Sequence, residues 1–241
     1  MKKVTIIIPA YNEALYITEL LEKVISVPTE SAGYDKEIIF VDDGSTDGTS
    51  LLAEKFESVR IFRQINKGKG AAVRHGISKA TGDIILIQDA DLEYDPLDYL
   101  LLLQEIGDKD DIAVYGSRTK GIIRSNGWKT FFPGKHHEQG FGPWAANIII
   151  TITTFILYGQ FITDMLTAYK LYPAKAIKKI SIKTSGFETD HEISAKLIKN
   201  GIKIKEVPIS YEPRSKNDGK KIRAIDGIKA LITLLKYRIF N

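Results

Sequence analysis

Ile84-Ile85-Leu86-Ile87-Gln88-Asp89-Ala90-Asp91-Leu92-Glu93 is the stretch that decides the fold. Its apolar run, bounded by polar residues, predicts a strand that is buried on both faces of a parallel sheet. Asp89 and Asp91 follow at the carboxyl end of this strand, and ligands bind at that edge in open α/β sheets. Neighbouring carboxylates repel each other unless a cation neutralises them, and hard oxygen ligands suit Mg²⁺ or Mn²⁺ that also holds a substrate's phosphates. The stretch therefore predicts a metal and diphosphate site at a sheet edge.

The chain around this stretch alternates strand-like and helix-like segments, which predicts a parallel sheet covered by helices. The expected strands are Val4–Ile8, Ile38–Val41, Val59–Phe62, Ile84–Ile87, Ile112–Tyr115 and Lys203–Tyr211. The expected helices are Glu13–Ile25, Thr49–Phe56, Ala71–Ala80 and Glu188–Asn200. The predicted class is α/β: a Rossmann-like, mostly parallel sheet flanked by helices, with a C-terminal amphipathic helix.

Composition narrows the class of protein further. The 241 residues include no cysteine, which excludes disulfides and thiolate metal sites and fits a reducing compartment. The net charge of +4 is uneven, because residues 214–238 contain eight basic and only two acidic side chains. This basic segment suggests a membrane surface, a nucleic acid or a phosphorylated substrate as partner.

Three later segments have their own patterns. Trp144–Tyr158 is strongly apolar but shorter than the roughly 20 residues that span a bilayer. We interpret it as a buried or interfacial helix, with a transmembrane span as the alternative. Ile222–Phe240 is amphipathic at helical spacing, either as core or as a membrane-surface helix. Lys120–Phe141, rich in Gly, Lys and aromatic residues, is expected to be a mobile loop.

Other motifs follow the predicted strands, and each has a simpler structural explanation. In the turn at 9–13, the tyrosine could stack on a base and the carboxylate could accept from ribose hydroxyls. The simpler explanation is a plain turn. Asp42 and Asp43 end the second strand, where a capping role would not explain both carboxylates. The Gly-rich turn at 66–72 opens a helix and could hold phosphate, but it matches neither a P-loop nor a dinucleotide fingerprint. Arg118 could bind an anion, whereas the His-rich run at 136–138 is expected to be a solvated loop.

These motifs, in this order, resemble the family 2 glycosyltransferases of GT-A fold. Within that family the likeness is to the dolichyl- or polyprenyl-phosphate hexose synthases. The early motifs that carry it lie at 8–13, 41–45, 66–71, 88–93 and 115–118. The later ones lie at 163–170, 186–190 and 207–222. The resemblance implies a catalytic domain over 1–213, with a nucleotide-sugar half (1–118) and an acceptor half (119–213), followed by a basic amphipathic segment (214–241).

The resemblance also implies roles for individual residues. The nucleotide sugar would be bound by Pro9, Tyr11, Asn12, Glu13, Asp42, Asp43, Lys69, Asp89 and Ala90. Asp89, Asp91 and Glu93 would hold Mg²⁺ or Mn²⁺. Asp91, Asp190 and Arg118 would be catalytic, and Arg118 with Arg214 would hold the acceptor's phosphate.

We therefore expect an inverting, metal-dependent transfer of a hexose from a GDP- or UDP-sugar to a polyprenyl or dolichyl phosphate. If the acceptor is instead a hydroxyl of a glycolipid, a diacylglycerol or a polysaccharide, a base is needed and Asp190 is the candidate. A nucleotidyltransferase and a non-catalytic basic binding protein are further alternatives. The expected place is the cytoplasmic face of a membrane. Because no hydrophobic span follows the catalytic residues, we expect docking through 222–240 and 144–158, or through a membrane subunit, and no nucleic-acid partner.

Overall fold

The computed structural model describes residues 1–127, 141–213 and 224–240. Its core is a seven-stranded sheet in the order β3-β2-β1-β4-β6-β5-β7. The strands are β1 (Lys2–Ala10), β2 (Tyr34–Asp42), β3 (Val59–Arg63), β4 (Ile84–Ile87), β5 (Ile112–Ser117), β6 (Lys170–Pro173) and β7 (Lys203–Pro208). The predicted α/β class with a mostly parallel sheet is confirmed.

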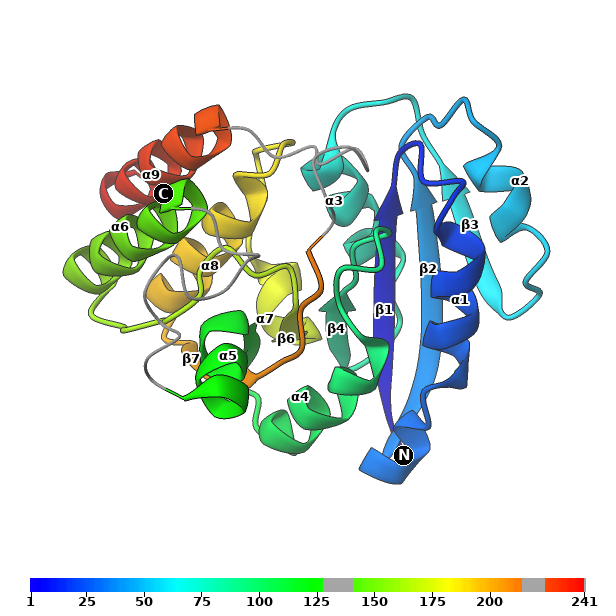
Figure 1. Cartoon of the computed structure of the whole chain (residues 1–241), viewed down its shortest axis with the longest axis horizontal. Coiled ribbons are helices and arrows are strands. Elements are labelled where there is room, and N and C mark those ends of the chain that lie inside the picture. Colours follow the sequence, from blue (N-terminus) through cyan, green and yellow to red (C-terminus); the bar gives the residue numbers. More distant parts are fainter. Residues whose placement is uncertain (128–140, 214–223, 241) are drawn as a thin grey trace.

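Helices cover both faces of this sheet (Figure 1). They are α1 (Ile17–Ser26), α2 (Thr49–Ala53), α3 (Lys69–Lys79), α4 (Tyr99–Ile106), α5 (Arg118–Asn126), α6 (Phe141–Tyr158), α7 (Ala174–Lys179), α8 (Thr189–Lys199) and α9 (Ala224–Ile239). Strand side chains alternate between the faces, so Ile6 and Ile8 of β1 join one core with α1 and α4. Ile7 points to the other core, which α3, α7 and α8 complete.

One strand runs against the others. β6 pairs antiparallel with both β4 and β5, so it starts at the edge where its neighbours end. Its first residue, Lys170, lies in register with Ile87 of β4 and Tyr115 of β5. Helices α5 and α6 separate β5 from β6, and β6 then returns antiparallel to its neighbours. This four-residue strand therefore does not follow the rhythm of parallel strands and crossover helices on which the sequence prediction relied.

The structure corrects two expectations about segments. Residues 120–126, expected as part of a mobile loop, belong to helix α5, and residues 128–140 lie outside the described residues. The expected helix from Glu13 begins only at Ile17, after a turn in which Glu13 O accepts from the amides of Tyr16 and Ile17. Helices α4 and α7 were not predicted, since both are short and adjoin proline-containing segments.

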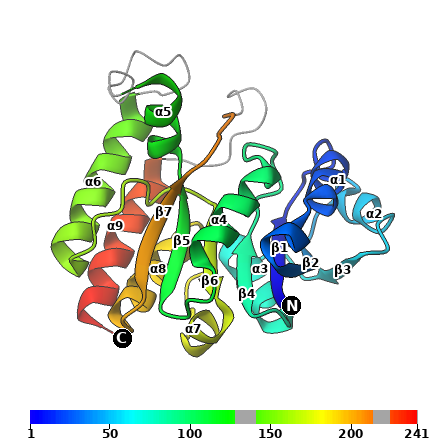
Figure 2. The same cartoon turned by 90° about the horizontal axis from the view of Figure 1, so that it is seen from below.

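The apolar segments form a helical pair at one end of the sheet. α6 packs against α9, and α9 also packs against α8. Figures 1 and 2 show α6 and α9 side by side, at the end of the molecule opposite β3. Among the described residues, no helix has both the length and the apolar character needed to cross a membrane.

Glycine at position 70 is required by the contact between α3 and α8. A Cβ there would overlap the side chain of Thr189 and lie 2.9 Å from Gly186 O. We predict that Gly70→Ala lowers the free energy of unfolding by about 1–3 kcal/mol, the usual cost of overpacking. Gly227→Ala in α9 is the matched control, because nothing lies within 4 Å of the added carbon. It should be neutral or stabilising by up to about 1 kcal/mol. Denaturant unfolding measures both, and a wild-type midpoint for Gly70→Ala would contradict this packing.

Candidate active site at the carboxyl edge of the sheet

The candidate site lies where β1, β2, β4 and β5 end. The loops after β1 and β2 are joined to each other. Asn12 N donates to Ser45 Oγ at 2.9 Å, and Asn12 Oδ1 accepts from Thr46 N at 2.8 Å. Glu13 N donates to Thr49 Oγ1 at 2.9 Å. Asn12 has a φ of 52°, a left-handed conformation that asparagine tolerates better than most residues. These hydrogen bonds join the two loops into one wall of the site.

The residues predicted to bind the nucleoside line this wall. Pro9 is buried at the end of β1, and Glu13 and Asp42 are also buried. Asp42 Oδ1 accepts from Ser45 N at 2.9 Å. The side chain of Tyr11, by contrast, is 40% exposed. An exposed aromatic ring can stack on a base, and the nearby loop carboxylates can accept hydrogen bonds from ribose hydroxyls.

Asp43 holds the Gly-rich turn before α3. Its Oδ1 accepts from Gln64 Nε2 at 2.7 Å and Lys67 N at 2.9 Å, and its Oδ2 accepts from Gly68 N at 2.8 Å. Ser185 O accepts from Gly70 N at 2.8 Å and from Ala71 N at 3.3 Å.

These amides are therefore committed to partners within the chain. The amides of Lys67, Gly68, Gly70 and Ala71 do not bind a phosphate in this conformation, and phosphate binding by the backbone of the turn stays a prediction. The turn instead positions the side chain of Lys69.

Lys69 joins two carboxylates from different elements. Its Nζ lies 2.6 Å from Asp89 Oδ1, after β4, and 3.8 Å from Asp190 Oδ2, on α8. Burial alone would lower the pKa of Lys69, but Asp89 and Asp190 outweigh it and hold the pKa above its usual range. Burial would raise the pKa of Asp190, yet Lys170 and Lys69 keep it below its usual range. The structure thus brings three predicted site residues together: the ammonium of Lys69 contacts the carboxylates of Asp89 and Asp190.

The acidic stretch bends sharply after Asp91. Leu92 has a φ of 58°, a conformation that costs a non-glycine residue on the order of 1–3 kcal/mol and often marks functional segments. Asp91 Oδ1 accepts from Glu93 N at 3.2 Å, and Glu93 Oε2 accepts from Tyr211 Oη–H at 2.8 Å. Ala90, between the two aspartates, is buried.

The predicted metal ligands have other partners in this conformation. Asp89 is paired with Lys69, and the Glu93 carboxylate accepts from Tyr211. Across the described parts of the chain, no group of three or more histidine, aspartate or glutamate side chains could hold a metal ion as it stands. The oxygen donors have the right chemistry for Mg²⁺ or Mn²⁺, so a bound ion would require Asp89, Asp91 and Glu93 to change partners.

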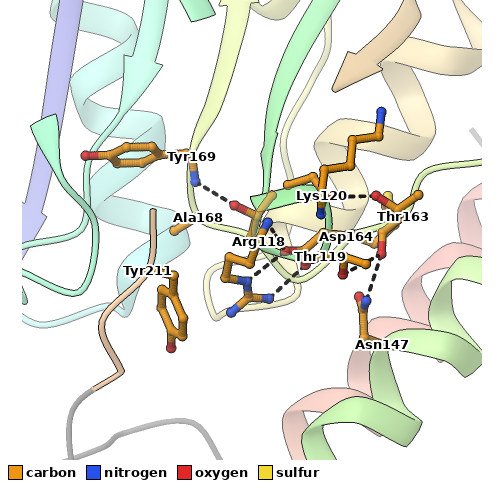
Figure 3. A network of polar contacts seen from close by, with 12 residues as sticks. Arg118, Thr119, Lys120, Asn147, Thr163, Asp164, Ala168, Tyr169 and Tyr211 are labelled. Carbon is orange, nitrogen blue, oxygen red and sulfur yellow. Dashed lines mark hydrogen bonds and ion pairs between the residues drawn. The ribbon is translucent and has the colours of Figure 1, made fainter. Parts of the chain in front are cut away.

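Arg118 lies at the end of β5 in a second charged group (Figure 3). Its Nε and Nη2 donate to the two oxygens of Asp164 at 2.7 and 2.8 Å, and its guanidinium lies 4.9 Å from the ring centroid of Tyr211. Burial would lower the pKa of Arg118, but Asp164 dominates and raises it further. The bidentate fork that could clasp a phosphate is thus already occupied by Asp164.

The predicted residues therefore fall into two groups at the same edge. One consists of Asp89, Lys69 and Asp190, and the other of Glu93 and Arg118, which both contact Tyr211. Arg214 and the run at 136–138 lie outside the described residues.

Sequence reasoning missed three residues of this site. Asp164 and Tyr211 lie within motifs that carried the family resemblance, but nothing in the spacing assigned them a partner. Lys170 had a visible signal, because it is the only charged residue in the otherwise uncharged run 165–174.

Comparison with known proteins agrees with this architecture. Residues 5–167 match the family model described as "Glycosyl transferase family 2". An uncharacterized protein of Methanocaldococcus jannaschii is 32% identical over 99% of this chain and 93% of its own length.

Two further relatives have named activities. A protein of Methanococcus voltae named UDP-N-acetylglucosamine–dolichyl-phosphate N-acetylglucosaminyltransferase is 26% identical, over 99% of this chain and 97% of its own length. A dolichyl-phosphate β-glucosyltransferase of Trichomonas vaginalis is 29% identical, over 98% of this chain and 73% of its own length.

A solved structure shows the same fold at low sequence identity. Glucosyl-3-phosphoglycerate synthase from Mycobacterium tuberculosis, crystallised with Mn²⁺, UDP and phosphoglyceric acid, superposes with a TM-score of 0.71 at 16% identity. The alignment covers 100% of this chain and 80% of that one. With the family model spanning more than half of its residues, the chain belongs to glycosyl transferase family 2, has the GT-A fold and is a glycosyltransferase.

Proposed function

We propose that this enzyme moves a hexose, with inversion, from a UDP- or GDP-sugar to a polyprenyl or dolichyl phosphate. The observation that carries the proposal is the row Asp89–Lys69–Asp190, in which a partly buried ammonium contacts one carboxylate from each of the two proposed halves of the chain. The named relatives, whose printed activities involve dolichyl phosphate, support the choice of acceptor.

The donor would lie across the wall formed by the loops after β1 and β2. We assign its nucleoside to Pro9, Tyr11, Asn12, Glu13 and Asp42. Asp43 contributes indirectly, because its carboxylate holds the turn that positions Lys69. The ammonium of Lys69 is placed to contact a diphosphate that enters beside Asp89, where it would stabilise the charge of the leaving group.

A divalent cation completes this donor site in the proposal. Asp89, Asp91 and Glu93 would hold Mg²⁺ or Mn²⁺, and the ion would neutralise charge on the departing diphosphate. The Mycobacterium tuberculosis synthase was crystallised with Mn²⁺ and UDP, which supports the same chemistry here. When the donor and the ion bind, Asp89 would exchange its contact with Lys69, and Glu93 its contact with Tyr211, for contacts with the ion.

The reaction needs an acceptor oxygen on the opposite face of the sugar. One oxygen of the acceptor phosphate forms the new bond to the anomeric carbon as the bond to the diphosphate breaks. A phosphate monoester has a second pKa near 6, so it is largely ionised at neutral pH and needs no base. The lowered pKa of Asp190 makes its carboxylate a weak base, which disfavours a hydroxyl acceptor.

Arg118 is proposed to contact the acceptor phosphate, together with Arg214. Asp164 occupies the Nε and Nη2 of Arg118. Arg118 would therefore contribute through its remaining nitrogen rather than by a bidentate contact. Asp164 fixes the guanidinium plane, and the ring of Tyr211 packs against it.

Acceptor chemistry is the first test of this proposal. Purified enzyme with Mn²⁺ and a panel of UDP- and GDP-hexoses should glycosylate a polyprenyl phosphate. The same polyprenol without its phosphate should react at least about 10²-fold more slowly, because a neutral hydroxyl needs a base. Mass spectrometry identifies the product, and NMR of its anomeric proton reports inversion. Faster transfer to polyprenol, diacylglycerol or a polysaccharide would contradict the phosphate acceptor and support the hydroxyl alternative.

We further propose that the enzyme binds the membrane surface, on the cytoplasmic face, through α6 and α9. These adjacent helices expose large apolar side chains to solvent. They are Ile149, Ile152, Phe155 and Ile156 of α6, and Ile225, Ile228, Ile232, Leu235 and Ile239 of α9. Basic residues accompany them on α9, namely Lys229, Lys236 and Arg238. An exposed apolar face flanked by cations is suited to a bilayer with anionic lipid. A membrane subunit that covers the same face is the competing occupant.

Vesicle binding tests this surface. Wild-type enzyme should cosediment with anionic vesicles, and a double variant, Ile152→Asp with Ile232→Asp, should bind at least tenfold more weakly. Burying one isoleucine side chain contributes about 1.5–3 kcal/mol to binding. Losing two of them therefore costs more than the roughly 1.4 kcal/mol that corresponds to a tenfold change in affinity. Leu51→Asp on α2 is the control, since Leu51 is also exposed but lies on another helix. Failure of the wild type to bind vesicles would contradict the membrane assignment and favour a protein partner.

A further inference from the structure

Lys170 is a buried cation at the active-site edge. The residue has no exposed surface, and it starts β6 between the ends of β4 and β5. Its Nζ donates to Met165 O at 3.2 Å and lies 5.1 Å from the ring centroid of Tyr115. Within the described residues, no carboxylate oxygen comes within 4.0 Å of this nitrogen. The ammonium is therefore buried without a direct ion pair to the part of the chain that the structure describes.

A cation in such a place is not explained by stability. Burying a charge is costly unless it is paired, and an apolar side chain of similar length would fill the same volume. Burial lowers the pKa of Lys170, so at neutral pH the burial of its ammonium opposes folding. A feature that opposes folding and lies at a reaction centre suggests a role in function.

Lys170 lies electrostatically between the two charged groups of the site. Asp190 and Asp164 attract its charge, whereas Lys69 and Arg118 repel it. Asp190 and Lys69 belong to the first group, and Asp164 and Arg118 to the second. His191, beside Asp190, is buried with neither ring nitrogen bonded to the described protein, and burial lowers its pKa to about 3. His191 therefore stays neutral, and the positive charges that act on Asp190 are those of Lys170 and Lys69.

A chain of contacts also connects Lys170 to the backbone that carries Asp190. The ring of Tyr115 lies under the ammonium, and the Tyr115 hydroxyl lies 2.7 Å from Ser194 Oγ. Ser194 Oγ–H donates to Asp190 O at 2.7 Å. Lys170 and Asp190 thus interact electrostatically and are also connected through the side chains of Tyr115 and Ser194. A substitution at one residue should therefore change the position or the pKa of the other.

We propose that Lys170 is a positioning residue for sugar transfer, acting through Asp190. Its ammonium attracts the Asp190 carboxylate and keeps it in position. Asp190 in turn attracts the ammonium of Lys69, so that Lys69 is shared between Asp190 and Asp89 and does not pair with Asp89 alone. That arrangement leaves Asp89 able to exchange partners when the donor arrives. The inference rests on the proposed function, because it assigns Lys69 and Asp89 to the donor's diphosphate.

A double-mutant cycle tests the inference. Lys170→Met and Asp190→Asn should each lower kcat about 10²-fold, the loss expected from misplaced catalytic groups. The double variant should be no more than about threefold worse than Asp190→Asn, because residues that act through one another are not additive. Lys170→Arg keeps the charge and should retain most of kcat. Lys170→Met should unfold at or above the wild-type midpoint.

Lys36→Met is the matched control. Lys36 is a partly buried lysine whose pKa is also lowered by burial, but it donates to the carbonyls of Val24, Ile25 and Val27 at the C-terminal end of α1. Its loss should reduce stability and leave kcat unchanged.

Wild-type kcat in Lys170→Met, fully additive losses in the double variant, or failure of Lys170→Met to fold would each overturn the inference. If wild-type enzyme transfers no sugar at all, the proposed function fails instead. The inference is then tested without substrate, by ¹³C NMR titration of the Asp190 carboxyl. Its pKa should rise in Lys170→Met, and an unchanged pKa would overturn the coupling.

Discussion

The site depends on a single physical constraint, which is that carboxylates gathered at one sheet edge need cations among them. Asp89 and Asp190 come from elements far apart in sequence, and Lys69 holds both. This ammonium is held in turn by local structure. The Gly68–Gly70 turn fits closely against the loop before α8, and Asp43 accepts hydrogen bonds from the amides of the turn. Charge balance and close packing are therefore two parts of the same arrangement.

The antiparallel strand β6 explains how the proposed acceptor half, residues 119–213, reaches this edge. Because β6 begins where β4 and β5 end, Lys170 and the preceding Asp164 are brought to the ends of parallel strands without a further crossover. Asp164 then fixes Arg118, and Tyr211 connects Arg118 with Glu93. These side chains connect the proposed donor and acceptor halves, so we expect a ligand bound in one half to change the electrostatic environment of the other.

Much of this could be predicted from the sequence, for definite reasons. Strongly apolar strands such as Ile84–Ile87 are recognised by composition, and their carboxylates are placed by the geometry of parallel sheets. Strand β6 was missed because four residues with a lysine at one end resemble a loop. The partner of Arg118 was missed because Asp164 lies 46 residues away, and no local pattern reports such a contact. The family assignment removes the nucleotidyltransferase and non-catalytic alternatives, whereas the roles of the individual site residues remain proposals.

The central claim is that Asp89 and Asp91 hold a divalent ion that in turn binds an activated hexose. Isothermal titration calorimetry of UDP- and GDP-hexoses, with and without Mn²⁺ or Mg²⁺, tests it most directly. The account predicts binding heat for at least one donor that requires the ion and is lost in Asp91→Asn, while the variant keeps the wild-type unfolding midpoint. The absence of heat with every donor, whichever ion is supplied, or ion-independent binding that Asp91→Asn leaves intact, would contradict it.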